Sequence, residues 1–109
     1  MLATGHQDGK VRFWDPASGT LIRTISAHQG WVRGVAWSPD GRILATSGQD
    51  KKACLWDGIS GNKLTEVMHN YLPVWSVAWA PGGRWISSGS GEYESERAGV
   101  AIVWTVPSY

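Results

Sequence analysis

Three side chains of reactive type, His28, Thr46 and Asp50, lie in one central stretch of the chain. An imidazole can take a proton from a hydroxyl, and a carboxylate can orient the imidazole, so together they could form a nucleophile–base–orienter arrangement. Threonine, however, is a poor nucleophile unless a dedicated base and an oxyanion hole accompany it. No set of His, Asp and Glu has metal-ligand spacing, and Cys54 is the only cysteine. We therefore expect no metal and no cofactor.

Length and charge narrow the classes of partner. The chain has 109 residues, which is one domain or a piece of one, and its net charge is +1 with ten basic and nine acidic residues. This balanced charge gives no excess of basic residues that would attract nucleic acid or anionic lipid. No apolar stretch approaches the roughly 20 residues of a membrane helix. We expect neither nucleic acid nor a membrane as partner, and the lone cysteine fits a cytoplasmic location.

An internal repeat organises the chain. "ATGHQDGKVRFWD" from Ala3 and "ATSGQDKKACLWD" from Ala45 are 42 residues apart and share Ala-Thr, Gln-Asp and Trp-Asp in register. "WSPDGRILATSGQD" from Trp37 aligns in the same way with "WAPGGRWISSGSGE" from Trp79. The period continues to about residue 90 and is then broken by an insertion at about 91–99. A repeat of this length is typical of solenoids, propellers and arrays.

Each period contains four short runs rich in Val, Ile, Leu, Thr and Trp, separated by turn residues such as Ser38-Pro39-Asp40-Gly41. The pattern predicts an all-β chain. In 53–57, apolar residues occupy both faces, which fits a small sheet covered on both sides by neighbouring sheets. We expect strands at 2–5, 11–15, 21–25, 32–37, 43–47, 53–57, 64–68, 74–79, 85–89 and 100–104.

These residues resemble the WD40-repeat family. "AHQGWVRGVAWSPDGRILATSGQDKKACLWD", from Ala27 to Asp57, fits the family pattern nearly throughout, whereas Thr105 stands where the last unit would have Asp. The resemblance implies four-stranded antiparallel blades of a β-propeller, about two and a half in this chain. We expect a partial blade at 1–26, a complete blade at 27–68 and a last blade with the insertion at 69–109.

The resemblance also gives the reactive trio a structural meaning. In WD40 proteins the equivalents of His28, Thr46, Asp50 and Trp56 form a buried hydrogen-bond chain within one blade, because a buried indole and imidazole must be paired. We therefore expect no catalytic residue and no enzyme activity. His6 is interpreted as a solvated loop histidine.

Nearly three blades cannot close a ring, so we expect a partial propeller or one closed by oligomerisation. A second copy that closes a dimer is the favoured arrangement, since Leu21 to Ile25 could complete another copy's last blade. The alternative is that the chain is part of a longer propeller.

The loops expected on one face of the propeller carry residue types that dominate protein interfaces. The candidate partner-binding residues are Trp31, Arg33, Tyr71, Trp75, Tyr93 and Glu94. The sequence thus favours a non-catalytic protein–protein interaction scaffold, or a fragment of one. Two alternatives stay open: a regulatory or sensor propeller segment of a larger multidomain protein, and a propeller that binds a carbohydrate or another small ligand, suggested by the eight Trp.

Overall fold

A computed structural model describes residues 1–69, 72–91 and 100–107. The described residues form strands and no helix. The strands are β1 Leu2–Gly5, β2 Lys10–Trp14, β3 Leu21–Ser26, β4 Val32–Trp37, β5 Ile43–Gly48, β6 Lys52–Asp57, β7 Lys63–Met68, β8 Val74–Trp79, β9 Trp85–Ser90 and β10 Val100–Thr105. All ten expected strands are present, with ends that differ by a residue at most.

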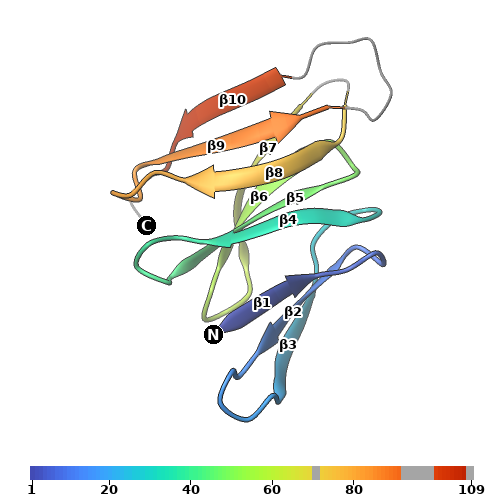
Figure 1. Cartoon of the computed structure of the whole chain (residues 1–109), viewed down its shortest axis with the longest axis vertical. Helices are drawn as coiled ribbons and strands as arrows, with labels where there is room; N and C mark the ends of the chain where they lie inside the picture. Colours follow the sequence, from blue (N-terminus) through green and yellow to red (C-terminus); the bar gives the residue numbers. More distant parts are fainter. Residues whose placement is uncertain (70–71, 92–99, 108–109) are drawn as a thin grey trace.

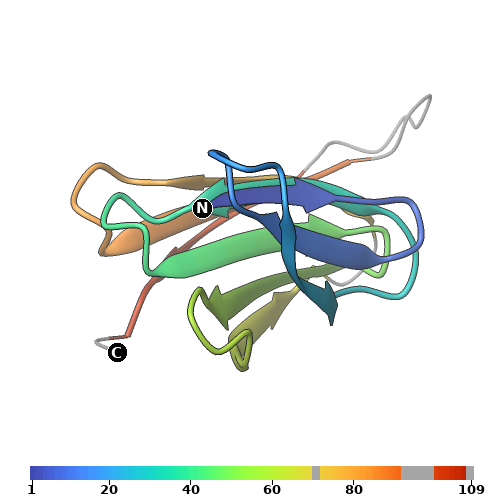
Figure 2. The ribbon, with the colours of Figure 1, turned by 90° about the horizontal axis from the view of Figure 1, so that it is seen from below.

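The strands form three antiparallel sheets, ordered β1-β2-β3, β4-β5-β6-β7 and β10-β9-β8. Figure 1 shows them as successive layers, with β4 between β1 and β8. Seen from below, the first sheet lies in front of the other two (Figure 2). The sheets do not close into a ring, so the fold is a partial propeller with one four-stranded sheet between two three-stranded sheets, which agrees with the expected all-β blades.

Short turns join neighbouring strands and fix their register. Between β4 and β5, Pro39 sets the first turn position and Gly41 adopts a φ of 74°, which side chains rarely tolerate. The Gly41 N–H donates to the Ser38 carbonyl at 2.8 Å, and the Ile43 N–H donates to Ser38 Oγ at 3.0 Å. The resulting register places Thr46 opposite Val35 on β4.

The middle sheet is buried on both faces. Leu44 and Cys54 pack with Val11 and Phe13 of the first sheet, whereas Ala45 and Leu55 pack with Ile86 of the third. Adjacent residues of a strand point to opposite faces, so one strand contributes to two cores. The doubly apolar pattern of 53–57 reflects this position.

The two outer sheets each keep an uncovered apolar surface. The half-exposed or more exposed side chains are Leu2, Leu21 and Ile22 on the first sheet, and Trp85, Val100 and Val103 on the third. β3 pairs with β2 of its own sheet and is an edge strand of that sheet. Among the described residues, no helix is long and apolar enough to cross a membrane.

Candidate functional site

The middle sheet brings His28, Thr46, Asp50 and Trp56 into one chain of hydrogen bonds. Trp56 Nε1 donates to Thr46 Oγ1 at 2.9 Å, and Thr46 Oγ1 lies 2.7 Å from His28 Nε2. His28 Nδ1 lies 2.8 Å from Asp50 Oδ1. Because an indole N–H only donates, the Thr46 hydroxyl can give its own proton to His28 Nε2. This direction leaves the His28 proton on Nδ1, where it faces the Asp50 carboxylate.

Burial determines what this chain can do chemically. Thr46 is fully buried and His28 is nearly so. Burial lowers the pKa of His28 below its ordinary value of 6.5, although the Asp50 carboxylate opposes the shift. The imidazole is therefore neutral at pH 7, and Thr46 Oγ1 has no face open to a substrate. The geometry favours a closed network that holds strands together over a nucleophilic site.

The first sheet holds a shorter version of the same network that the sequence did not predict. Trp14 Nε1 donates to Thr4 Oγ1 at 2.8 Å, and Thr4 Oγ1 lies 2.7 Å from His6 Nε2. The interpretation of His6 as a solvated loop histidine was therefore wrong, because the ring is half-buried and hydrogen-bonded. Thr4 and Trp14 match Thr46 and Trp56 in the repeat, but His6 follows Thr4 on the same stretch of chain, so the repeat gave no signal for it.

The third sheet has only part of the network. His69 Nε2 lies 2.7 Å from Ser88 Oγ. Within the described part of the chain, buried Trp104 Nε1 and His69 Nδ1 have no hydrogen-bond partner. The repeat position that corresponds to Asp50 is Glu92, which is outside the described residues.

At the loop end of the middle and third sheets, Arg33 lies between two tryptophan rings. Its guanidinium carbon is 4.2 Å from the centre of the Trp31 ring and 4.4 Å from that of Trp75. Both distances are within the range of cation–π attraction. We call this arrangement the Trp31–Arg33–Trp75 stack.

Two β-bulges orient the Arg33 and Trp75 side chains of the stack. On β4, Val32 pairs with Gly48 and Gly34 with Ser47, so Arg33 is an extra residue without a cross-strand partner. The third sheet repeats this irregularity on β8, where Trp75 is the extra residue. Bulges commonly re-aim a side chain, and here two equivalent bulges turn side chains of neighbouring sheets toward each other.

Close packing of β4 on β8 brings the two bulges within reach. A Cβ atom at Gly34 would be 3.4 Å from the Ser76 Cα and 3.4 Å from the Trp75 carbonyl oxygen. Only a residue without a side chain allows this approach without displacement, since Ser47 Oγ would lie at 2.8 Å. Gly34 therefore sets the spacing over which the stack forms.

The stack is open to solvent. Trp31 is 42% exposed and Trp75 is 40% exposed. Gln49 Oε1 accepts hydrogen bonds from Arg33 Nε at 3.0 Å and from Nη2 at 2.9 Å, and Trp75 Nε1 donates to the Gly91 carbonyl. The structure thus brings three of the candidate partner-binding residues together. The other three, Tyr71, Tyr93 and Glu94, lie outside the described residues.

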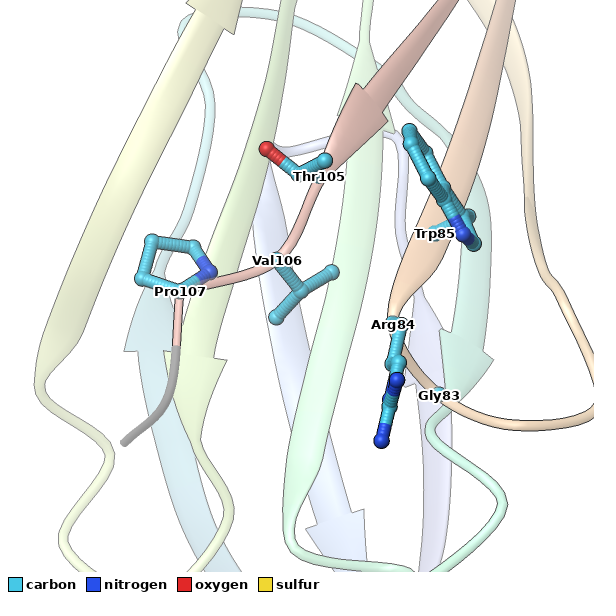
Figure 3. Close-up of a pocket in the computed structure, with 6 residues that line it drawn as sticks. All are labelled: Gly83, Arg84, Trp85, Thr105, Val106 and Pro107. Carbon is cyan, nitrogen blue, oxygen red and sulfur yellow. The ribbon is translucent and has the colours of Figure 1, made fainter.

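A hollow lies at the end of the third sheet opposite to the stack (Figure 3). It has a volume of about 580 Å³ and is lined by Gly83, Arg84, Trp85, Thr105, Val106 and Pro107. Trp85 is half-exposed beside it. Apart from Arg84, these side chains carry no charge, and the hollow continues the uncovered face of the third sheet. In the part of the chain that is described, no group of His, Cys, Asp or Glu is arranged to hold a metal ion.

Comparison with known proteins agrees with this repeated architecture. Residues 19–57 and 62–93 match the family model described as "WD domain, G-beta repeat". The chain belongs to the WD40-repeat family. Its matched regions include the whole middle sheet apart from a short loop, and most of the third.

Several curated proteins are similar in sequence to part of this chain. The chain is 56% identical over 43 residues to Ribosome assembly protein 4 of Chaetomium thermophilum. This match covers 39% of the chain and 8% of the relative. The chain is 46% identical over 43 residues to Nuclear distribution protein PAC1 of Mycosarcoma maydis, and this match covers 39% of the chain and 10% of the relative. A Lissencephaly-1 homolog of Branchiostoma floridae is 42% identical over 41 residues, covering 38% and 10%. Each match spans about a tenth of the relative's length.

Proposed function

We propose that this chain is a non-catalytic WD40 scaffold that binds protein partners through the Trp31–Arg33–Trp75 stack. The stack carries the proposal because it gathers two half-exposed tryptophans and an arginine on one open surface. Tryptophan and arginine are enriched among the residues that dominate binding energy at protein interfaces. The two bulges orient Arg33 and Trp75, and hydrogen bonds to Gln49 and Gly91 hold these two side chains, so we expect little conformational entropy to be lost when a partner binds.

The buried network of His28, Thr46, Asp50 and Trp56 supports a non-catalytic role. Its hydroxyl and imidazole are satisfied by one another and shielded from solvent. We propose that it maintains the register of the blade and thereby the position of the bulges on β4. The same division into blades at 1–26, 27–68 and 69–109 is proposed for the chain.

Two further points belong to the proposal. The uncovered faces of the outer sheets favour additional blades beside them, from a second copy, with a dimer preferred, or from a longer propeller. We also propose a cytoplasmic location. Carbohydrate binding is disfavoured because most of the tryptophans that the repeat aligns are strand residues of the core, among them Trp56 and Trp37.

A peptide-display selection tests the proposed function. The immobilised chain is used to enrich peptides from a random library, and the enriched peptides are measured against the Trp31→Ala/Trp75→Ala double variant. We expect binding to weaken by more than about tenfold in that variant. The matched control is Ile59→Ala, an apolar residue that is 84% exposed in a turn at the other end of the sheets. Equal binding by wild type and the double variant would contradict the proposal.

A further inference from the structure

The edge of the Arg33 guanidinium is only partly used within the chain. A guanidinium carries five N–H donors in a planar fork. Gln49 Oε1 accepts from Nε and Nη2, which occupies the side of the fork nearest the aliphatic stem. The outer end, formed by Nη1 and the second N–H of Nη2, has no hydrogen-bond partner among the described residues.

Among the described residues, no carboxylate pairs with the charge of Arg33. In the described part of the chain, the ion pairs join Arg12 with Asp8, His28 with Asp50, and Lys52 and Lys63 with Glu66. Within the described ranges, Arg33 hydrogen-bonds to the neutral amide of Gln49 and lies against two indole rings. A cation that is partly desolvated and lacks a counter-charge is a ready site for an anion.

The stack restricts the shape of that anion. The centres of the Trp31 and Trp75 rings lie 4.2 Å and 4.4 Å from the guanidinium carbon, so we expect a ligand to reach this group at its open edge, in the plane of the fork. A carboxylate is planar and can place one oxygen on Nη1 and the other on Nη2, parallel to the two N–H bonds. The rims of the indoles, 42% and 40% exposed, would then contact the aliphatic part of the same side chain.

From this geometry we infer that the stack is a carboxylate-binding site that receives an Asp or Glu side chain of the protein partner. The inference rests on the proposed function and specifies the chemistry of its partner. Gln49 orients the arginine plane in advance through two hydrogen bonds, and the two indole rings lie against it. Lysine could not replace Arg33, because an ammonium group offers no planar fork and does not stack between two rings.

A titration with short peptides tests the inference. The probes are capped tetraglutamate, capped tetraglutamine and inorganic phosphate, all at the same low ionic strength. Binding is followed by NMR at the Arg33 Nε–H and at the Trp31 and Trp75 indole N–H signals. We expect tetraglutamate to bind at least about tenfold more tightly than tetraglutamine. The Arg33→Gln variant should lose this preference, and Arg33→Lys should recover only a small part of it.

Arg42→Gln is the matched control, because it removes one exposed positive charge from a turn at the other end of the sheet. It should keep the preference for tetraglutamate. An equal loss in Arg42→Gln would show general charge attraction and overturn the inference. Binding of phosphate without binding of tetraglutamate would also overturn it. Circular dichroism confirms that each variant keeps the wild-type fold before it is titrated.

The two proposals fail in different ways. If the chain does not discriminate tetraglutamate from tetraglutamine, but still binds displayed peptides in a manner that depends on Trp31 and Trp75, the carboxylate assignment alone is wrong. If displayed peptides bind equally well to the Trp31→Ala/Trp75→Ala variant, the proposed function is wrong as well.

Discussion

Thr46 Oγ1 lies 2.7 Å from His28 Nε2, and this contact joins β5 to the loop before β4 within one blade. The same oxygen accepts the indole proton of Trp56 on β6. One hydroxyl thus connects two strands and a loop that the sequence separates. The contact depends on a single oxygen atom, so it can be removed with little change in shape.

Replacing Thr46 by valine removes the hydroxyl and keeps the branched shape of the side chain. Trp56 Nε1 and His28 Nε2 are then buried without partners. We expect the free energy of unfolding to fall by about 2–4 kcal/mol, measured by urea unfolding. Thr46→Ser keeps the hydroxyl and should lose much less. A Val variant as stable as the Ser variant would show that the network contributes nothing to stability.

The stability of the chain should depend on pH through its buried histidines. Burial lowers the pKa of His28 and of His69 below 6.5 in the folded chain. The unfolded chain therefore binds more protons below pH 6.5, and the free energy of unfolding falls as the pH decreases. We expect a decrease between pH 7 and about pH 5, and a smaller one in His28→Gln. A free energy that is constant or rises over this window would contradict the buried, neutral state of His28.

Gly48 tests the packing around the network. A Cβ atom at this position would lie 2.5 Å from His28 Nδ1 and 2.8 Å from Asp50 Oδ1. Gly48→Ala should therefore lower the free energy of unfolding by about 1–3 kcal/mol, since the ring cannot move without breaking its hydrogen bonds. Gly82→Ala is the control, because nothing lies within 4 Å of its Cβ position. Equal thermal stability of the two variants would show that the site around His28 is loosely packed.

The uncovered face of the third sheet should promote self-association. Val103 is 67% exposed on β10, at the edge of a sheet, and Trp85 is 50% exposed beside it. We expect light scattering across a dilution series to show a mass above 11.9 kDa, with two chains preferred. Val103→Lys should lower the mass, whereas Ile59→Lys in an exposed turn should not. A well-folded monomer at micromolar concentration would contradict this prediction.

A comparison of two equivalent tryptophans supports the view that the first sheet lacks a strand beside β1. Trp79 Nε1 donates to the Ala36 carbonyl of β4, on the preceding sheet, at 3.0 Å. Trp37 occupies the same repeat position, but its buried Nε1 has no partner among the described residues. The first sheet has no strand in the position that β4 has in the middle sheet. It therefore has no carbonyl that could accept from Trp37 as the Ala36 carbonyl accepts from Trp79. A strand added beside β1 would bring one.

Most of the fold was predictable because equivalent residues in two repeats predict the same strands and turns. The runs around Val32 and Val74, or around Ala53 and Val100, give the same strand at equivalent positions, and the turn residues mark where each ends. Their grouping into sheets, however, came from the family resemblance and not from the strand pattern. The two-sided burial of β6 was indicated by its apolar residues on both faces.

The candidate site was less predictable. Arg33 and Trp75 are 42 residues apart, which is one repeat, and this spacing was the available signal that they lie on neighbouring sheets. Their contact also requires two bulges, which alternation of apolar residues does not reveal. His6 was missed for a different reason, because it reaches Thr4 from the same stretch of chain and has no equivalent in the other repeats.

The most direct test of the central claim is to locate bound peptide by NMR at the eight tryptophan indole signals. The strongest peptide from the display selection is added to the labelled chain, and each indole N–H is followed through the titration. We predict that the Trp31 and Trp75 signals shift together and saturate, while buried Trp56 does not move. Shifts confined to Trp85, or no shift at Trp31 and Trp75 while the peptide is bound, would place the binding surface elsewhere and contradict the account.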